Sequence, residues 1–146
     1  LKVFSEKPGY PKLNYISDYK TATELANLYR ESSCLVSATR GEGFGMVFLE
    51  AAACGLPIIV TGWGGHMDFV TKANARLVNY KLCPAAEMQY DCDARDSLLA
   101  EADIDDLAKA MRDIFNERSV PEFDRQWLRE YTWPALADRF IEICSQ

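Results

Sequence analysis

Two acidic residues, Glu42 and Glu50, are the side chains of this sequence best suited to bind a polar ligand. Seven residues separate them, and Gly41, Gly43 and Gly45 surround the first acid. A carboxylate can accept hydrogen bonds from two neighbouring hydroxyl groups at once. The pair therefore predicts contact with a molecule that carries hydroxyl groups in two places.

The glycines before Met46 predict an anion site at the start of a helix. The first backbone N–H groups of a helix have no partner within it, and the helix dipole places partial positive charge there. Glycine also lets a ligand approach the backbone closely. We expect the N–H groups of Gly45, Met46 and Val47 to bind phosphate. A sugar nucleotide, which has a diphosphate between a hexose and a ribose, would satisfy both the amides and the two acids.

Glu50 is expected to be buried, because the other residues from Met46 to Cys54 are all apolar and a helix of that kind is covered nearly all round. An unpaired buried carboxylate is costly, or its pKa rises until it is neutral. Glu50 therefore needs a partner. That partner is either the ligand or an internal group, such as an arginine or backbone N–H groups.

Strands and helices alternate around this segment, which predicts a single α/β domain over residues 1–146. We expect short strands at 1–4, 14–17, 34–38, 57–61 and 75–80, and helices at 21–30, 45–54, 103–116, 121–131 and 133–144. Residues 66–70 predict one helical turn, and residues 81–102 are expected to be irregular. Continuously apolar strands are typical of a parallel sheet with helices on both faces. Ligands bind such sheets at the carboxyl ends of the strands, where residues 39–45 would lie.

Composition excludes several classes of protein. The net charge of −6 argues against nucleic-acid binding, and no stretch approaches the roughly 20 apolar residues of a membrane span. Five cysteines without a Cys-x-x-Cys pair, and a single histidine, argue against a zinc site. Cys34, Cys54 and Cys144 are expected to be buried thiols in a reducing cytoplasm, whereas a Cys83–Cys92 bridge would need an oxidising compartment. The first residue is Leu1, so we expect a piece of a longer protein.

The segment from Glu42 to Pro57 resembles a family signature. It begins Glu-Gly-Phe-Gly and continues, from Leu49, as Leu-Glu-Ala-Ala-Ala-Cys-Gly-Leu-Pro. This is similar to the Leu-Glu-Ala-x-Ala-x-Gly-x-Pro run of retaining glycosyltransferases of the GT-B fold, family 4 (glycosyl transferases group 1). Residues 64–70 resemble the family's Gly-Gly-x-x-Glu segment, with Asp68 in place of the glutamate. The resemblance covers most of residues 14–145 and is weakest at 81–102.

The resemblance implies a Rossmann-like parallel sheet with helices on both faces, the C-terminal donor-binding half of a GT-B enzyme. It implies that Glu42 is the catalytic residue, which lies by the hydroxyls of the donor sugar and helps to orient it, and that Glu50 binds the ribose hydroxyls. The reaction would be hexosyl transfer from a nucleotide-diphosphate sugar with retention of configuration, without a metal or other cofactor. The full set of expected substrate-binding residues comprises the loop, the start of the helix and one residue further upstream: Arg40, Gly41, Gly43, Phe44, Gly45, Met46, Val47, Glu50 and Ile16.

The resemblance also implies what this chain lacks. The family's N-terminal domain binds the acceptor, which is a sugar, a lipid or a protein. The first strand–helix unit of the donor domain brings an arginine and a lysine to the diphosphate, and neither has a match here. The isolated chain is therefore expected to bind its donor weakly and to transfer nothing.

Other residues that could do chemistry have simpler interpretations. Arg40 could reach a phosphate or be a solvated charge, and His66 is interpreted as a loop residue rather than a general base. Trp63 either packs under the second group of glycines or lines the cleft. The remaining aromatic and acidic candidates are interpreted as core or interface anchors (Trp127, Trp133) and as solvated charges (Asp91, Asp93, Asp96).

Three alternative functions fit less well. A dinucleotide-binding oxidoreductase needs glycines spaced as Gly-x-Gly-x-x-Gly and an acid about 20 residues further on, and residues 60–65 contain no acid. A binding or interaction domain without transfer activity would be expected to lose one of the two glutamates. A GT-B-like epimerase or phosphorylase is disfavoured by the motif spacing.

Overall fold

A computed structural model of the chain describes residues 9, 11–85, 97–117 and 125–145. The expected strand at 1–4 lies outside the described residues. The described elements follow one another as α2 (Ala22–Glu31), β1 (Leu35–Ser37), α3 (Met46–Ala53), β2 (Ile58–Thr61), the 3₁₀ turn η1 (Gly65–Asp68), β3 (Arg76–Val78), β4 (Tyr80–Pro84), β5 (Leu98–Ala102), α4 (Ile104–Glu117), the 3₁₀ helix η3 (Gln126–Tyr131) and α5 (Trp133–Cys144).

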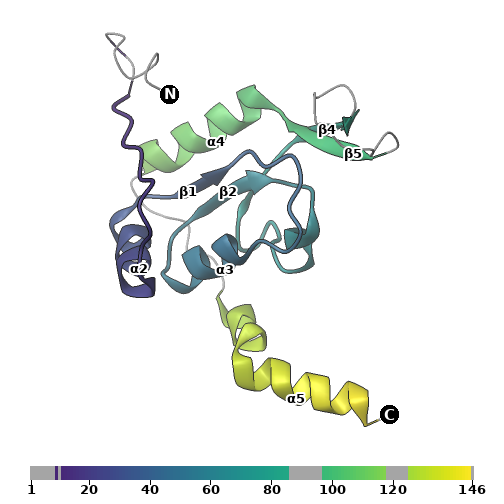
Figure 1. The fold of residues 1–146 in the computed structure, drawn as a ribbon. Helices are drawn as coiled ribbons and strands as arrows, with labels where there is room; N and C mark the ends of the chain where they lie inside the picture. The colour runs from purple at the N-terminus through teal and green to yellow at the C-terminus, as the bar shows by residue number, and fades with distance from the viewer. Residues whose placement is uncertain (1–8, 10, 86–96, 118–124, 146) are drawn as a thin grey trace.

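Three parallel strands form the central sheet, with β2 between β1 and β3 (Figure 1). All four residues of β2 are buried. Ile58 and Val60 belong to a core cluster with Phe48 and Ala51 of α3, while Ile59 belongs to a second cluster with Ala110 of α4. Helices therefore cover both faces of a parallel sheet, which confirms the predicted Rossmann-like α/β fold.

Local sequence signals place the helices that carry the site. A capping box begins α2: the Thr21 N–H donates to Glu24 Oε2 (2.8 Å), and the Glu24 N–H donates to Thr21 Oγ1 (3.3 Å). Gly55 follows α3 with a left-handed φ of +83°, and the Leu56 N–H donates to the Ala51 carbonyl (2.9 Å). These contacts confirm the predicted start of α2 and end of α3.

Three expectations about the strands are wrong. Residues 14–17 form no strand. Strand β1 is half-buried rather than fully buried: it lies at the edge of the described sheet, although Leu35 packs against one core cluster and Val36 against the other. Residues 81–102 are not irregular throughout: β4 and β5 pair antiparallel, with Tyr80 opposite Ala102 and Pro84 opposite Leu98.

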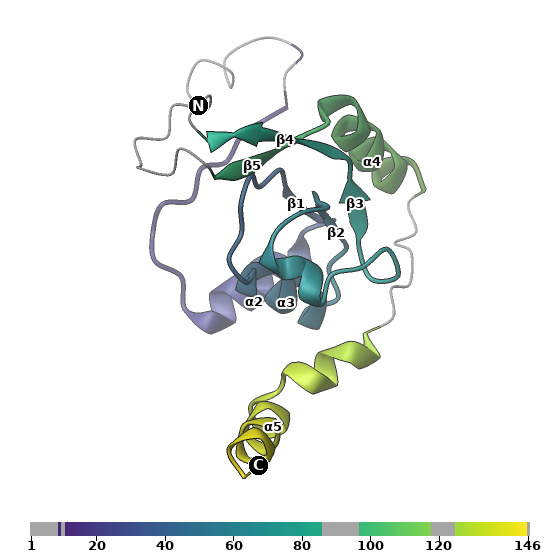
Figure 2. The ribbon, with the colours of Figure 1, turned by 90° about the vertical axis from the view of Figure 1, so that its right-hand side faces the viewer.

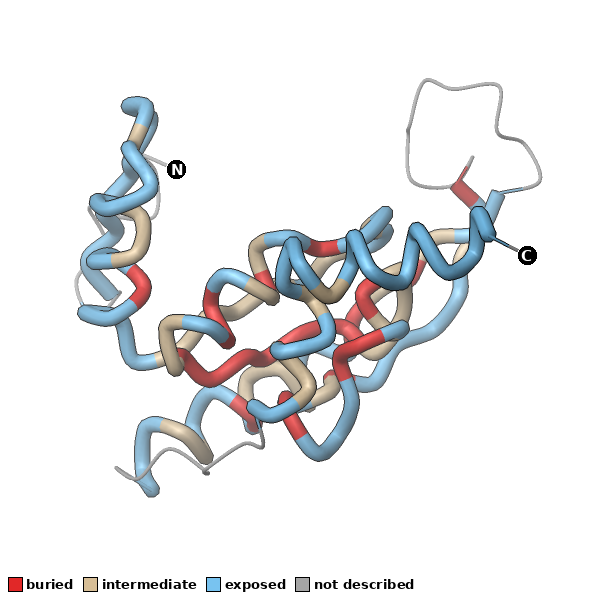
Figure 3. Tube along the Cα trace, turned by 90° about the horizontal axis from the view of Figure 1, so that it is seen from below, coloured by how far each residue is buried: buried red, intermediate tan, exposed pale blue. Residues whose placement is uncertain are grey.

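The C-terminal part of the chain has the predicted helix from Trp133 to Cys144, which Figures 1 and 2 show projecting from the rest of the molecule. Figure 3 shows it exposed over nearly its whole length. Cys144 is exposed, so its predicted burial is wrong, and Trp133 is 87% exposed and no core anchor. Trp127 does anchor η3, because its ring stacks on Phe69 with centroids 5.7 Å apart.

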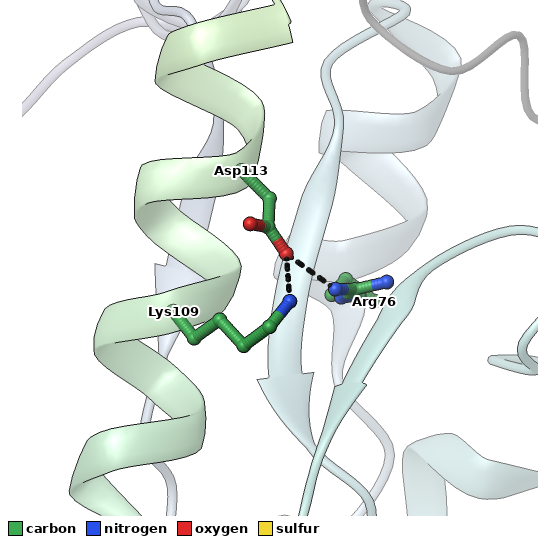
Figure 4. Close-up of polar contacts among 3 residues, drawn as sticks. All are labelled: Arg76, Lys109 and Asp113. Atoms are coloured by element: carbon green, nitrogen blue, oxygen red, sulfur yellow. Dashed lines mark hydrogen bonds and ion pairs between the residues drawn. The ribbon is translucent and has the colours of Figure 1, made fainter.

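Helix α4 is tied to the edge of the sheet by charge. Asp113 Oδ2 lies 2.6 Å from both Arg76 Nη2 of β3 and Lys109 Nζ (Figure 4). The hydrogen bond from Lys109, followed by the charges of Lys109 and Arg76, lowers the pKa of Asp113. None of the described helices is long and apolar enough to cross a membrane.

Candidate functional site

Two glycine loops meet at the carboxyl ends of β1 and β2. The first glycine loop is residues 39–45, between β1 and α3, and the second is residues 62–65, which leads from β2 into η1. The Gly65 N–H donates to the Glu42 carbonyl (2.8 Å) and joins the two loops through their backbones. In Figure 1, β1 and β2 point to the right, and Figure 2 shows the molecule from that side. The carboxyl ends of the strands therefore face the reader in Figure 2.

The N-terminus of α3 is open, as the sequence predicts. Gly45 precedes the helix in a left-handed conformation (φ +92°, ψ +48°), and no side chain of the described residues caps it. A Cβ at Gly45 would lie 2.5 Å from Cδ2 of Phe48, so both the backbone angle and the space require glycine. Met46 is 59% exposed and Val47 half-buried, whereas Gly45 is buried. Of the three residues whose amides were expected to bind phosphate, Met46 and Val47 are therefore the ones that solvent reaches.

Glu42 lies at a cavity between the two loops. The cavity has a volume of about 690 Å³ and is lined by Gly41, Glu42, Gly62, Trp63, Gly64, Gly65, Met67, Tyr80 and Leu99. Glu42 itself is half-buried, and its Oε1 accepts a hydrogen bond from the Phe44 N–H (3.3 Å). Phe44 is held against Phe69, with ring centroids 5.2 Å apart. The backbone of the loop therefore orients the carboxylate beside the cavity.

Glu50 is exposed, so its predicted burial is wrong. Helix α3 has only eight residues and buries one side, through Phe48, Ala51 and Ala52, which leaves Glu50 on an uncovered side. Its partner is neither an arginine nor a backbone amide: the Tyr29 hydroxyl donates to Glu50 Oε2 (3.1 Å). Burial, and then the hydrogen bond and charge of Glu50, raise the pKa of Tyr29 to about 12.

The structure also places two other predicted site residues, Arg40 and Ile16. Arg40 is exposed, and its Nε lies 2.8 Å from Glu101 Oε2 on β5. This hydrogen bond lowers the pKa of Glu101. Ile16 is 43% exposed in a stretch without regular structure, so it does not end a strand. Asp91, Cys92, Asp93 and Asp96 lie outside the described residues. Among the described residues, no three His, Cys, Asp or Glu side chains group as a metal site.

His66 is fully buried and is not a loop residue. Its Nε2 lies 2.9 Å from the Thr61 carbonyl, which can only accept, so Nε2 carries the hydrogen. A Cβ at Gly45 would lie 3.0 Å from the His66 Cβ, and a Cβ at Gly64 would lie 3.2 Å from its Nδ1. His66 therefore packs beneath both glycine loops and supports them.

Sequence reasoning missed the contributions of Tyr29, Tyr80 and Leu99. Tyr29 is a residue of α2 and is only 8% exposed. Tyr80 and Leu99 reach the cavity because β4 and β5 pair with each other across residues distant in the sequence. No local pattern marks either residue, since side-chain alternation does not reveal which strand lies beside which loop.

Comparison with known proteins gives a consistent result. A family described as "Glycosyl transferases group 1" matches residues 11–117. An uncharacterized glycosyltransferase from Methanocaldococcus jannaschii is 33% identical over 114 residues, which is 78% of this chain and 28% of that protein. A D-inositol 3-phosphate glycosyltransferase from Corynebacterium urealyticum is 28% identical over 143 residues, which is 98% of this chain and 30% of that protein.

A D-inositol 3-phosphate glycosyltransferase from Streptomyces bingchenggensis is 49% identical over a shorter stretch of 45 residues, which is 31% of this chain and 10% of that protein. The chain thus spans less than a third of the length of these relatives. The matched family and the open helix N-terminus beside a carboxylate agree with each other. The chain belongs to the glycosyl transferases group 1 family.

Proposed function

We propose that this chain is the C-terminal, donor-binding domain of a retaining GT-B glycosyltransferase of family 4. The observation that carries the proposal is the uncapped N-terminus of α3 beside the cavity that Glu42 lines. The donor is a nucleotide-diphosphate hexose. The acceptor, a sugar, lipid or protein, binds to an N-terminal domain of the full-length protein, and the cysteine usage favours a cytoplasmic enzyme.

The helix N-terminus supplies the positive potential for the diphosphate. The chain carries a net charge of −6, and Arg40 of the first glycine loop is paired with Glu101. Backbone amides of Gly45, Met46 and Val47, with the helix dipole behind them, bind an anion without a metal ion or a free cation. The same amides stabilise the charge that the diphosphate gains as it leaves.

Glu42 orients the glycosyl group. The Phe44 N–H donates to its carboxylate and the residue lines the cavity, so we assign this carboxylate to accept hydrogen bonds from the hydroxyls of the sugar ring. In the reaction, the bond from the anomeric carbon to the diphosphate breaks, and a bond from that carbon to an acceptor oxygen forms. The acceptor's proton passes to the leaving diphosphate. Glu42 holds the ring in the orientation that this exchange needs.

Glu50 binds the ribose. It is exposed on the flank of α3, and its Oε2 already accepts a hydrogen bond from Tyr29. A carboxylate has about four acceptor sites on its two oxygens, so the Tyr29 bond leaves room for ribose hydroxyls. Tyr29 fixes the rotation of the carboxylate before the nucleotide arrives.

The test measures donor binding and transfer by the full-length protein. Calorimetric titration with UDP-, GDP- and ADP-linked hexoses identifies the donor, and product analysis reports the anomeric configuration. We expect Glu50→Ala to weaken donor binding roughly tenfold, since hydrogen bonds to a charged group contribute about 1.5–3 kcal/mol. Glu42→Gln should lower the transfer rate by about a hundredfold.

Two variants serve as controls. Glu31→Gln removes an exposed carboxylate at the end of α2, away from both loops, and should leave donor affinity unchanged. Tyr29→Phe removes the hydrogen bond but keeps the Glu50 carboxylate, so it should weaken the donor less than Glu50→Ala does. Unchanged affinity in Glu50→Ala would refute the ribose role. Donor binding without any transfer would point to a binding domain, and an inverted product would refute retention.

A further inference from the structure

We infer that the β4–β5 hairpin is one wall of the donor site and that Trp63, Tyr80 and Leu99 select the glycosyl group. The inference rests on the proposed function and adds to it the residues that distinguish one sugar from another. It comes from the cavity described above, whose lining combines both glycine loops with side chains of β4 and β5.

The hairpin is fastened to the first glycine loop at two points. The Ala100 N–H donates to the Arg40 carbonyl (2.9 Å), and Arg40 Nε pairs with Glu101 Oε2 (2.8 Å). Both contacts come from neighbouring residues of β5, one through the backbone and one through side chains. The hairpin therefore has a fixed position relative to the loop that carries Glu42.

The side chains of the wall lie directly over the two loops. A Cβ at Gly41 would lie 3.5 Å from Cδ2 of Leu99 and 4.0 Å from Cζ3 of Trp63, so both side chains reach this glycine. A Cβ at Gly62 would lie 3.8 Å from Cε1 of Tyr80. Tyr80 and Leu99 of the hairpin, together with Trp63 of the second glycine loop, thus give the cavity an apolar part of its lining.

The chemistry of the cavity matches a sugar ring. A hexose has C–H groups on its faces and hydroxyls around its edge. The wall offers apolar contact to a face, while Glu42, which lines the same cavity, accepts hydrogen bonds from the edge. A mainly apolar pocket with a few fixed polar groups is typical of small-ligand sites, and about 690 Å³ lies in their usual range.

Strand β5 provides a matched pair of variants. Leu99 is half-buried and faces the cavity, whereas its neighbour Leu98 is 47% exposed and is absent from the lining of this cavity. Adjacent strand residues point to opposite faces, so Leu99→Ala and Leu98→Ala remove the same group from the two sides of one strand. Trp63→Ala removes the ring contributed by the second loop.

The experiment compares two affinities in the full-length protein by calorimetry: that for the nucleoside diphosphate and that for the same nucleotide carrying its hexose. We expect Leu99→Ala and Trp63→Ala to weaken the nucleotide sugar about tenfold and to leave the bare diphosphate unchanged, in line with the discrimination that apolar contacts supply. Leu98→Ala should leave both affinities unchanged. Leu99→Met and Trp63→Phe should recover most of the loss, and circular dichroism checks the fold of each variant.

The outcomes separate this inference from the proposed function. If the wild-type protein binds neither ligand, both the proposed function and the inference about the β4–β5 hairpin are refuted. If the wild type binds both and the wall variants match it, the wall is refuted while the donor site stands. Equal losses for both ligands, or a raised KM for the acceptor alone, would also refute selection of the donor sugar by the wall.

Discussion

In the first glycine loop a Cβ at Gly43 would meet no atom within 4 Å, whereas in the second loop a Cβ at Gly65 would fall on the Gly43 carbonyl oxygen. The first loop is open at this glycine. The second is closed, because its backbone packs directly on the first and the Gly65 N–H donates to Glu42. Similar glycine-rich sequences thus serve two purposes, and only the space around each glycine distinguishes access for a ligand from contact between backbones.

The largest effect on stability is expected from a substitution in the second glycine loop. Gly65→Ala must push the carbonyls of Glu42 and Gly43 away, and overpacking of this kind costs about 3 kcal/mol of unfolding free energy. Gly43→Ala, in the open loop, should change stability far less. Urea unfolding of both variants measures the difference. Equal stability of the two would show that the loops do not pack as closely as the comparison requires.

The sequence predicted the parts of the fold that depend on local signals. The Thr21 capping box, the Gly55 helix end and the apolar run of β2 each depend on a few neighbouring residues, and all three are present. The uncapped start of α3, where we propose the anion site, followed from the same kind of signal. Local sequence signals are therefore sufficient to predict the first glycine loop and the helix that follows it.

Contacts between distant residues could not be predicted in this way. The apolar neighbours of Glu50 suggested burial, but which side of α3 is covered depends on how α2 packs, and Glu50 is exposed. His66 looked like a loop residue because nothing in its neighbours reveals that Phe48 and both glycine loops enclose it. The β4–β5 hairpin depends on pairing across residues far apart in the sequence.

A substitution at Gly45 should fill space in the first glycine loop and strain its backbone. Gly45 is left-handed, and a Cβ there would clash with the Phe48 ring and press on the His66 Cβ, so Gly45→Ala should cost about 2 kcal/mol of unfolding free energy. Because the strain falls on the turn that carries the α3 amides, nucleoside diphosphate binding should weaken as well. Calorimetry and urea unfolding measure the two effects. A stable variant that binds normally would contradict the geometry of this turn.

The burial of the Tyr29 hydroxyl, and then its hydrogen bond to Glu50 of α3, should give stability that depends on pH. The pKa of Tyr29 is about 12 in the folded protein, above the ordinary value near 10. The folded state therefore keeps a proton that the unfolded state loses. Its contribution is complete below about pH 10 and disappears as the pH rises through about 12.

Tyr29→Phe should cost about 1 kcal/mol at neutral pH and should remove this part of the alkaline loss. Urea unfolding at a series of pH values measures both effects. Tyr15→Phe is the control, since Tyr15 is 74% exposed and should behave as the wild type. An alkaline profile that is the same in Tyr29→Phe and in the wild type would show that the buried hydroxyl plays no part in it.

The smallest effect on activity is expected from the ion pair that joins the first glycine loop to the β4–β5 hairpin. Arg40 and Glu101 are joined by a solvent-accessible ion pair, while the Ala100 N–H to Arg40 carbonyl bond holds the same place through the backbone. Glu101→Gln should therefore raise the KM for the donor only about twofold at low salt. High ionic strength screens the pair in the wild type and should erase the difference. A large effect that persists in high salt would mean that the side chains, rather than the backbone, keep the open loop against the hairpin.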